Sequence, residues 1–353
     1  MMKLLNSTLE EIAGLDQDKI KEARERLNSL TKPPGSLGKL EELAAKLAGI
    51  QGNIYPRIKN KAHILLAADH GVAAEGVSAV PQEITAQMVE NFLDGGAAIN
   101  VLSRQAGADL KVIDIGVARD IEREGLINRK IRYGTANLCR EAAMTEEEAV
   151  SSLEVGIEIA RETIAEGVEL LGVGEMGIAN TTSSSAILAV LGDYQLDEIV
   201  GYGSGISSEK LNKKKQVIRE AIKINQPDPG DGLDVLAKVG GLEIGGMAGV
   251  MLGAAAESVP VIVDGFISGA AALLAYKLEP KVVDYLISSH ESEEPGHRKI
   301  FDFLGMEPML QLNMRLGEGT GAVLAMSLVE AAGKIISEMA TFADLKMDTG
   351  EML

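Results

Sequence analysis

The chain has 353 residues, a formal charge of −18 at pH 7 and only 3% aromatic residues. This length accommodates two domains, or one large α/β domain with a helical annex. The negative charge excludes a protein that follows nucleic-acid phosphates with a basic face. Cys139 is the only cysteine, so the chain can form neither an internal disulfide nor a cysteine-based zinc site. The four histidines have no metal-binding spacing, and we expect no metal.

No targeting or membrane-spanning segment is predicted. Residues 1–6 lack the apolar run of a signal peptide. The most apolar stretches are interrupted by charges at Glu257 and Asp264. A chain with one cysteine also fits the reducing cytosol. We therefore expect a soluble, cytoplasmic protein that binds small ligands and has neither a nucleic acid nor a membrane as its partner.

The chain opens with two predicted helices. Apolar residues recur at helical spacing over residues 8–30, and a second helical pattern covers residues 40–51. Between them, residues 32–38 read Lys-Pro-Pro-Gly-Ser-Leu-Gly and must break the helix. These prolines either end one helix and start the next, or form a stiff turn that packs over a binding slot of its own or of a partner subunit.

Five apolar segments, each followed by a polar or glycine turn, predict the strands of a sheet. They are residues 62–68, 110–115, 168–173, 259–263 and 282–287. Helical patterns lie between or after them, at residues 85–106, 145–166, 181–191, 208–223, 231–239 and 266–276. This alternation predicts an α/β fold, a doubly wound, mostly parallel, Rossmann-like sheet whose ligand lies outside the carboxyl ends of the strands.

A last predicted helix covers residues 321–342 and is expected to pack on the N-terminal helices. Both chain ends would then build one small helical domain. The predicted division is residues 1–58 for the helical part of the small domain, 59–320 for the large α/β domain, and 321–353 for the C-terminal helix that completes the small domain.

One segment matches Gly-x-Gly-x-x-Gly, from Gly172 to Gly177. The motif is typical of dinucleotide binding and keeps a nicotinamide-dependent oxidoreductase open as an alternative. Its mid-chain position and the anionic Glu175 within it count against a bound pyrophosphate. The polar residues Asn180 to Ser185 follow, and Thr181 to Ser185 carry hydroxyl groups at a helix start, which predicts either a phosphate seat or an N-terminal cap.

Further polar residues follow the other predicted strands. A second glycine-rich turn, Gly201–Gly205, leads into the only dense basic run, residues 210–215, from which a lysine is expected to reach a phosphate. Asp264 either orients a ribose or caps a helix, and residues 289–292 are either an active-site rim or an ordinary loop. His70 is either a base or, more commonly for such a residue, a hydrogen-bonded structural histidine.

Residues 314–325 read Met-Arg-Leu-Gly-Glu-Gly-Thr-Gly-Ala-Val-Leu-Ala. One carboxylate, Glu318, stands between Gly317 and Gly319, and glycines allow positive φ and the close approach of a ligand. Apolar neighbours would raise the pKa of Glu318 towards neutrality, where a general base works best. The alternative is that Glu318 merely complements the dipole at a helix N-terminus.

Together these segments resemble the nicotinate-nucleotide–dimethylbenzimidazole phosphoribosyltransferase family, whose members make the lower-ligand nucleotide of cobalamin. The matching segments occur in order along nearly the whole chain, and so many ordered matches are more specific than a single glycine motif. They are Pro33–Gly38, Asp69–Val72, Pro81–Met88, Gly174–Thr182, Lys238–Ile244, Asp264–Phe266 and Met314–Gly321.

The resemblance implies that Glu318 is the catalytic base, that no cofactor is needed and that the protein is a homodimer. It implies phosphate contacts around Gly177, Gly203 and Lys214. The other substrate-binding residues that it implies are Glu175, Asn180, Thr181, Asp264, Ser292, Gln87, Met88 and Leu316. The chain departs from the family at Ala179, where a glycine is expected, and in the Gly201–Gly205 turn, which has Tyr-Gly-Ser where Arg-Gly-Thr is frequent.

The implied reaction moves 5-phosphoribose from nicotinate mononucleotide to 5,6-dimethylbenzimidazole or a related base. The pyridinium of the nucleotide is already a good leaving group, so one carboxylate that accepts the azole proton suffices. The alternatives to this transferase are a nicotinamide-dependent oxidoreductase and a non-catalytic nucleotide-binding module. The sequence does not choose among dimethylbenzimidazole, plain benzimidazole, adenine and a phenolic compound.

Overall fold

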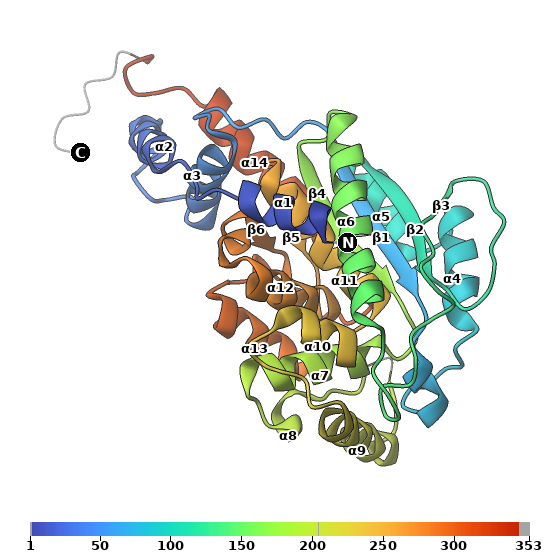
Figure 1. Ribbon diagram of the computed structural model, residues 1–353. Helices are drawn as coiled ribbons and strands as arrows, with labels where there is room; N and C mark the ends of the chain where they lie inside the picture. Colours follow the sequence, from blue (N-terminus) through green and yellow to red (C-terminus); the bar gives the residue numbers. More distant parts are fainter. Residues whose placement is uncertain (1, 204, 346–353) are drawn as a thin grey trace.

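The computed structural model describes residues 2–203 and 205–345. At its centre lies a six-stranded sheet of order β3-β2-β1-β4-β5-β6, in which every neighbouring pair is parallel (Figure 1). The strands are β1 (Lys61–Ala68), β2 (Ala108–Gly116), β3 (Leu126–Asn128), β4 (Leu170–Met176), β5 (Val261–Val263) and β6 (Leu286–Ser288). Helices cover both faces, so the predicted doubly wound α/β fold is confirmed.

β1 lies between β2 and β4, and all of its residues are buried. Its largely apolar sequence suits a strand covered on both faces. The order of the strands reverses at β1 and β4, and ligands of open α/β sheets bind outside the carboxyl ends of the strands at such a point. The fold therefore brings the ends of β1, β4 and β5 to one rim.

One face of the sheet is covered by α6 (Glu146–Ala165), α11 (Leu242–Ala256) and α12 (Phe266–Leu278), and α1 (Lys3–Glu11) packs on α6 and α11. Glycines let the backbones of α6 and α11 approach closely. A Cβ on Gly156 would lie 2.8 Å from the backbone nitrogen of Val250. The core between these helices is aliphatic, as the low aromatic content predicts.

The other face carries α3 (Lys39–Gln51), α4 (Ile84–Leu93), α5 (Ala98–Ala106) and α14 (Thr320–Glu338). α2 (Gln17–Ser29) packs on α3 and α14, and an antiparallel bridge joins Leu30 to Thr341. Helices from both chain ends therefore meet, although α1 lies on the opposite face and α14 also packs on β4 and β5. The division into domains at 58/59 and 320/321 stays a prediction.

Most of the remaining elements gather beside the carboxyl ends of the strands, in the lower part of Figure 1. They are η1 (Gly71–Glu75), α7 (Asn180–Gly192), α8 (Leu196–Ile199), α9 (Ser208–Asn225), α10 (Gly232–Val239), α13 (Pro295–Leu304) and a second, two-stranded sheet of β7 (His290–Glu291) and β8 (Leu310–Gln311). By contrast, η2 (Pro280–Tyr285) leads into the amino end of β6, where the hydroxyl of Tyr285 donates to the carbonyl of Ala13 at 3.0 Å. Residues of α7, α9 and β7 take part in the walls of the site described below.

The prediction of one continuous helix is wrong for two long segments, because each segment forms two helices. The predicted helix 8–30 divides into α1 and α2, and Asp16 caps α2 by accepting the backbone N–H of Lys19 at 3.0 Å. The predicted helix 85–106 divides into α4 and α5 around Gly95, whose φ is 76°. Asn100 then closes the start of α5 by accepting the N–H of Ala97 at 3.0 Å.

Other differences lie in the second half of the chain. Most of the predicted strand 282–287 is instead the 3₁₀ helix η2, and only its end belongs to β6. The predicted helix 321–342 ends at Glu338, because the chain then turns to bridge Leu30. α11 and α13 were not predicted. α11 is buried along nearly its whole length, so it lacks the amphipathic periodicity that reveals a surface helix.

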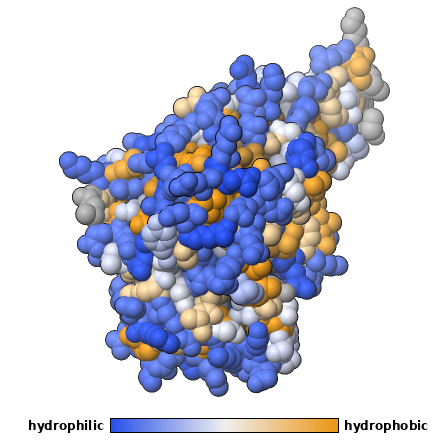
Figure 2. All heavy atoms as spheres, turned by 90° about the vertical axis from the view of Figure 1, so that its right-hand side faces the viewer, coloured by the Kyte–Doolittle hydropathy of each residue, from blue (hydrophilic) through white to orange (hydrophobic). Residues whose placement is uncertain are grey.

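Within the described residues, α14 is the single helix long and apolar enough to cross a membrane by length and composition. However, 56% of its most apolar window is buried inside the protein, against α3, α5 and the sheet. That is the pattern of a core helix. The face of the molecule seen in Figure 2 is largely hydrophilic, with apolar patches between the polar side chains.

Candidate active site

A cavity of about 580 Å³ opens at the carboxyl ends of β4 and β5 and at the start of α14. It brings together nearly all the site residues predicted from the sequence. Those that line it are Met88, Glu175, Gly177, Asn180, Thr181, Gly203, Lys214, Asp264, Ser292, Leu316 and Glu318. Gln87 is exposed on α4 and does not line the cavity, because adjacent residues of a helix point in different directions. The roles assigned to these residues stay predictions.

Glu318 occupies a sharp turn just before α14. The φ angles of Gly317, Glu318 and Gly319 are 85°, 61° and 85°, and the left-handed region costs a residue other than glycine about 1–2 kcal/mol. The side chain of Glu318 is buried, and its Oε2 accepts the backbone N–H of Ile99 at 3.3 Å. Burial raises the pKa of Glu318 despite this bond, and the charge of Asp264 raises it further. The turn therefore presents a carboxyl group with a raised pKa to the cavity.

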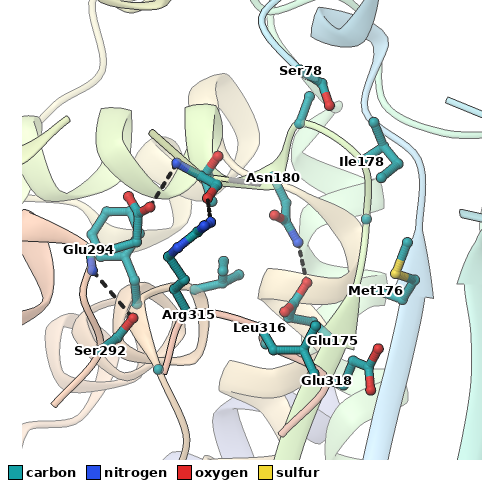
Figure 3. A pocket seen from close by; sticks show the side chains of 18 of the residues that line it. Ser78, Glu175, Met176, Ile178, Asn180, Ser292, Glu294, Arg315, Leu316 and Glu318 are labelled. Atoms are coloured by element: carbon teal, nitrogen blue, oxygen red, sulfur yellow. Dashed lines mark hydrogen bonds between the residues drawn. The ribbon is translucent and has the colours of Figure 1, made fainter. Parts of the chain in front are cut away.

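Glu175, near the end of β4, is a second carboxyl group of the same cavity. Its carboxylate accepts a hydrogen bond from the side-chain amide of Asn180 (Figure 3). Burial and then the charge of Glu243 raise the pKa of Glu175 to about 8, although the bond from Asn180 lowers it. Glu175 is therefore mostly protonated near pH 7 and can donate a hydrogen bond to a ligand.

The raised pKa of Glu175 predicts a pH-dependent effect of Glu175→Gln on stability. The neutral form stabilises the folded state fully below pH 4.5, and this stability is lost as the pH rises through about 8. Glutamine stays neutral, so the ligand-free variant should gain over the wild type by about 1.4 kcal/mol per pH unit within that window. Urea unfolding at pH 5 and pH 8 measures the gain. Equal differences at both pH values would contradict the assignment.

Asp264 follows β5 and holds the first turn of α14. Its Oδ1 accepts the backbone N–H of Ala322 at 3.0 Å, and Nδ1 of His290 lies 3.7 Å from the same oxygen. Burial raises the pKa of Asp264, and His290 and the backbone bonds counteract this effect. Asp264 thus fixes the helix that Glu318 precedes, while it also lines the cavity.

Lys214 lies at the end of the cavity formed by α7 and α9. It projects from α9, is 1% exposed, and its Nζ donates to Oγ1 of Thr181 at 2.8 Å. Burial lowers the pKa of Lys214 to about 8, and the charge of Glu294 counteracts part of this effect. A largely protonated, buried ammonium beside the N-terminus of α7 is suited to bind a phosphate.

Two residues at this end were not predicted from the sequence, Glu294 and Arg315. Oε1 of Glu294 accepts the N–H of Gly203 at 2.7 Å, and Nη1 of Arg315 donates to the carbonyl of Gly203 at 3.0 Å (Figure 3). The backbone N–H of Glu294 lies 3.4 Å from Oγ of Ser292. The glycine-rich turn is therefore held on both sides. Arg315 precedes Leu316 in the segment 314–325, so the sequence offers its positive charge as a candidate ligand for a phosphate. Glu294 lies outside every segment that the sequence analysis singles out, so no sequence feature points to it.

The wall near Glu318 is apolar. Met88 comes from α4, Met176 and Ile178 come from the end of β4 and its turn, and Leu316 is 59% exposed at the mouth. Val80 and Ile84 continue the same wall. Apolar side chains of this kind accommodate a flat aromatic ring next to the carboxyl group of Glu318.

The Gly-x-Gly-x-x-Gly match does not form a dinucleotide turn. Gly172 and Gly174 lie inside β4, whereas the motif requires glycines in the turn between strand and helix. A Cβ on Gly174 would lie 2.6 Å from the backbone carbonyl carbon of Glu318. Gly174 therefore makes room for the turn of Glu318, and Gly172 makes room for His63 and Met326. The oxidoreductase alternative loses the motif that supported it.

His70 is a structural histidine within the described chain. It is completely buried, its Nε2 lies 2.6 Å from Oε1 of Glu243, and its Nδ1 lies 3.1 Å from Oγ of Ser183. Burial lowers the pKa of His70, but the charge of Glu243, its hydrogen bond and the charge of Asp69 together outweigh this effect, and the net shift is upward. His70 does not line the cavity, and it acts on the site through Glu243, whose charge raises the pKa of Glu175.

The departure at Ala179 has a structural consequence. Its φ is 77°, a conformation in which glycine is free of the penalty that alanine carries. This explains why the resemblance leads one to expect a glycine here. The other departure includes Ser204, which lies outside the described residues.

The proline turn of residues 32–38 does not belong to this cavity within one chain. Pro33 and Pro34 are exposed, and no residue of the turn is among those that line the cavity. The hypothesis that the turn covers the slot of its own subunit is therefore wrong. The version in which a partner subunit supplies the turn stays a prediction.

Comparisons with known proteins agree along the whole chain. Residues 12–346 match a family described as phosphoribosyltransferase. The nicotinate-nucleotide–dimethylbenzimidazole phosphoribosyltransferase of Chloroflexus aggregans is 56% identical over 344 residues, which are 97% of this chain and 98% of that protein. The protein of the same name from Desulforamulus reducens is 54% identical over 99% of this chain and 100% of its own. The crystal structure of CobT from Thermus thermophilus superimposes with a TM-score of 0.91 and 46% identity, and covers 94% of this chain and 100% of its own.

Proposed function

Because this chain belongs to the nicotinate-nucleotide–dimethylbenzimidazole phosphoribosyltransferase family, we propose that it moves 5-phosphoribose from nicotinate mononucleotide to 5,6-dimethylbenzimidazole or a related base. The products are α-ribazole 5′-phosphate and nicotinate, for assembly of the nucleotide loop of cobalamin. The observation that carries the proposal is Glu318, a buried carboxyl group with a raised pKa in the same cavity as the buried ammonium of Lys214.

The chemistry needs one base and no added acid. A ring nitrogen of the incoming base attacks C1′ of the ribose on the face opposite the pyridinium, and the bond from C1′ to the nicotinate nitrogen breaks. The electron pair of that bond neutralises the pyridinium, so nicotinate leaves without a proton. The attacking azole becomes positively charged and passes its N–H proton to the carboxylate of Glu318.

The two ends of the cavity suit the two substrates. The phosphate of the nucleotide would lie between Lys214, Thr181 and the start of α7. Because Glu294 accepts the N–H of Gly203, a phosphate that binds this N–H must share it with Glu294 or displace the carboxylate. The flat base would lie against Met88 and Leu316, next to Glu318.

A product assay tests the proposed function. The purified protein is mixed with nicotinate mononucleotide and, in separate reactions, with dimethylbenzimidazole, benzimidazole, adenine or a phenol, and nicotinate and the new riboside phosphate are separated by chromatography. We expect release of nicotinate only when an acceptor base is present, in equal amount to the riboside. Absence of both products with every base would refute the transferase and leave the nucleotide-binding module.

We also propose that the protein works in the cytoplasm as a homodimer whose partner subunit places residues 32–38 over the base slot. The proline turn is stiff and exposed on its own subunit. An ion pair of 2.8 Å between Lys32 at the start of the turn and Glu41 on α3 fixes the position of the turn. Such an exposed, rigid surface suits a contact between subunits.

Replacing Pro33 and Pro34 with alanine should weaken binding of the base and change nucleotide affinity little. Loss of a rigid wall raises the entropy cost of closing the slot, so the Kd for the base should rise severalfold. Titration of the folded dimer with each substrate measures both constants. If the melting temperature falls while both constants stay the same, the prolines only separate α2 from α3.

A further inference from the structure

His63 is a buried residue for which the reaction above has no role. It lies in the middle of β1 and is 0% exposed, and its Nε2 lies 2.9 Å from the backbone carbonyl oxygen of Glu318. A carbonyl oxygen only accepts, so Nε2 carries the hydrogen and donates it. Burial lowers the pKa of His63 to about 4, although the bond to Glu318 raises it. The ring is therefore neutral near pH 7, with its other nitrogen unprotonated.

Glycines form a slot that holds this ring in one orientation. A Cβ on Gly174 would lie 2.6 Å from Nε2, and a Cβ on Gly172 would lie 2.9 Å from Nδ1. A Cβ on Gly319 would overlap the ring itself. Larger side chains at these three positions would expel the imidazole. The glycines of β4 and of the Glu318 turn therefore make room for His63.

The polar contacts of His63 point to the same purpose. Among residues 2–203 and 205–345, Nδ1 of His63 has no hydrogen-bond partner. The hydrogen bond from Nε2 to the carbonyl of Glu318 is therefore the one polar contact of the ring within these residues. An apolar residue would fill the slot without burying an unpaired nitrogen. Packing alone therefore does not account for a histidine here.

We propose that His63 is a positioning residue for Glu318, whose Nε2–H holds the carbonyl of the turn and so keeps the carboxyl group directed into the cavity. The inference rests on the proposed role of Glu318 as the base. The bond from Ile99 holds the carboxyl end of the same residue. With both bonds in place, a residue of φ 61° is fixed at its backbone and at its side chain, which is the precision that proton transfer requires.

Two amide variants separate positioning from packing. In His63→Gln the side-chain amide nitrogen reaches about as far as Nε2 and can donate to the same carbonyl, whereas the shorter side chain of His63→Asn cannot. Leu65→Ala is the matched control, because Leu65 lies two residues along β1 on the same face and is also buried. The assays measure kcat, the KM for nicotinate mononucleotide and the dependence of kcat on pH, with melting temperatures for all variants.

We expect His63→Asn to lower kcat by roughly tenfold to a hundredfold, since a misplacement of about 1 Å can cost 10²-fold. The KM for the nucleotide should stay the same, because the phosphate end is separate. The acidic limb of kcat should move to lower pH, because a released Glu318 becomes hydrated and only Asp264 still raises its pKa. His63→Gln should restore most of kcat, and Leu65→Ala should lower the melting temperature without shifting the limb.

Equal losses in the Asn and Gln variants, with the acidic limb in its wild-type place, would overturn the inference. An inactive wild-type protein would refute the proposed function instead, and ¹⁵N NMR of wild-type His63 then decides about the positioning bond without any turnover. A proton on Nε2 that persists from pH 5 to pH 8 supports the bond, and a proton on Nδ1 overturns it. The same spectrum serves if the variants do not fold.

Discussion

Glu318→Gln should fold like the wild type and lose most of its turnover. Glutamine has nearly the same shape, and its side-chain oxygen can still accept the N–H of Ile99 that Glu318 now receives. What the variant loses is the ability to take the azole proton, and general-base catalysis typically contributes about 10²–10⁴-fold to the rate. Turnover of nicotinate mononucleotide with dimethylbenzimidazole measures the loss.

The pH profile adds a second readout for Glu318. Only the ionised carboxylate can act as a base, so kcat should fall as the pH decreases through the pKa of Glu318. Because burial raises this pKa, the acidic limb should lie above the value of about 4.3 of an ordinary glutamate. Glu338→Gln, an exposed residue at the end of the same helix, is the matched control and should change neither quantity. A Glu318→Gln variant that keeps more than half of the wild-type kcat would show that the base is another group.

Lys214→Ala should raise the KM for nicotinate mononucleotide far more than that for the base. A charge-assisted hydrogen bond is worth about 1.5–3 kcal/mol, which corresponds to roughly 10–150-fold in affinity. The ammonium of Lys214 is buried at the end of the cavity, and salt screens the attraction between buried charges less than that between exposed ones. Steady-state kinetics with each substrate varied in turn measures both constants.

Two further variants make the Lys214 result unambiguous. Lys213→Ala removes a neighbouring lysine that is exposed on α9 and should leave both constants unchanged. Lys214→Met keeps the aliphatic stem but removes the charge, so it should reproduce the effect on the nucleotide with less loss of packing. If the constant for the nucleotide is the same in wild type and Lys214→Met, the phosphate binds elsewhere in the cavity.

The two carboxyl groups of the cavity illustrate how environment separates the roles of like residues. Burial, and then the charges of Glu243 and Asp264, drive Glu175 towards its neutral form, with a pKa of about 8. Glu318 accepts the N–H at the start of α5, which partly offsets the effect of burial. One group is thereby suited to donate a hydrogen bond to a substrate and the other to accept a proton, although both have the same side chain.

The sequence by itself determined the class of fold and the candidate base. Largely apolar segments such as residues 62–68, in which His63 is the one polar residue, are each followed by a polar turn and encode buried parallel strands, because burial on both faces favours apolar side chains at nearly every position. Glycines on both sides of a carboxylate likewise encode the left-handed turn found at Glu318. These are local properties, and local periodicity and composition report them.

The tertiary structure alone decided which distant groups touch. His63 on β1, Gly174 on β4 and Glu318 before α14 meet because the sheet order and the packing of α14 bring three remote segments together. The contact of Glu294 with Gly203 arises in the same way. The break between α1 and α2 was present in the sequence as a capping aspartate, but the apolar pattern continued across it. Side-chain contacts across the fold depend on the relative placement of whole elements, which no local pattern of residues contains.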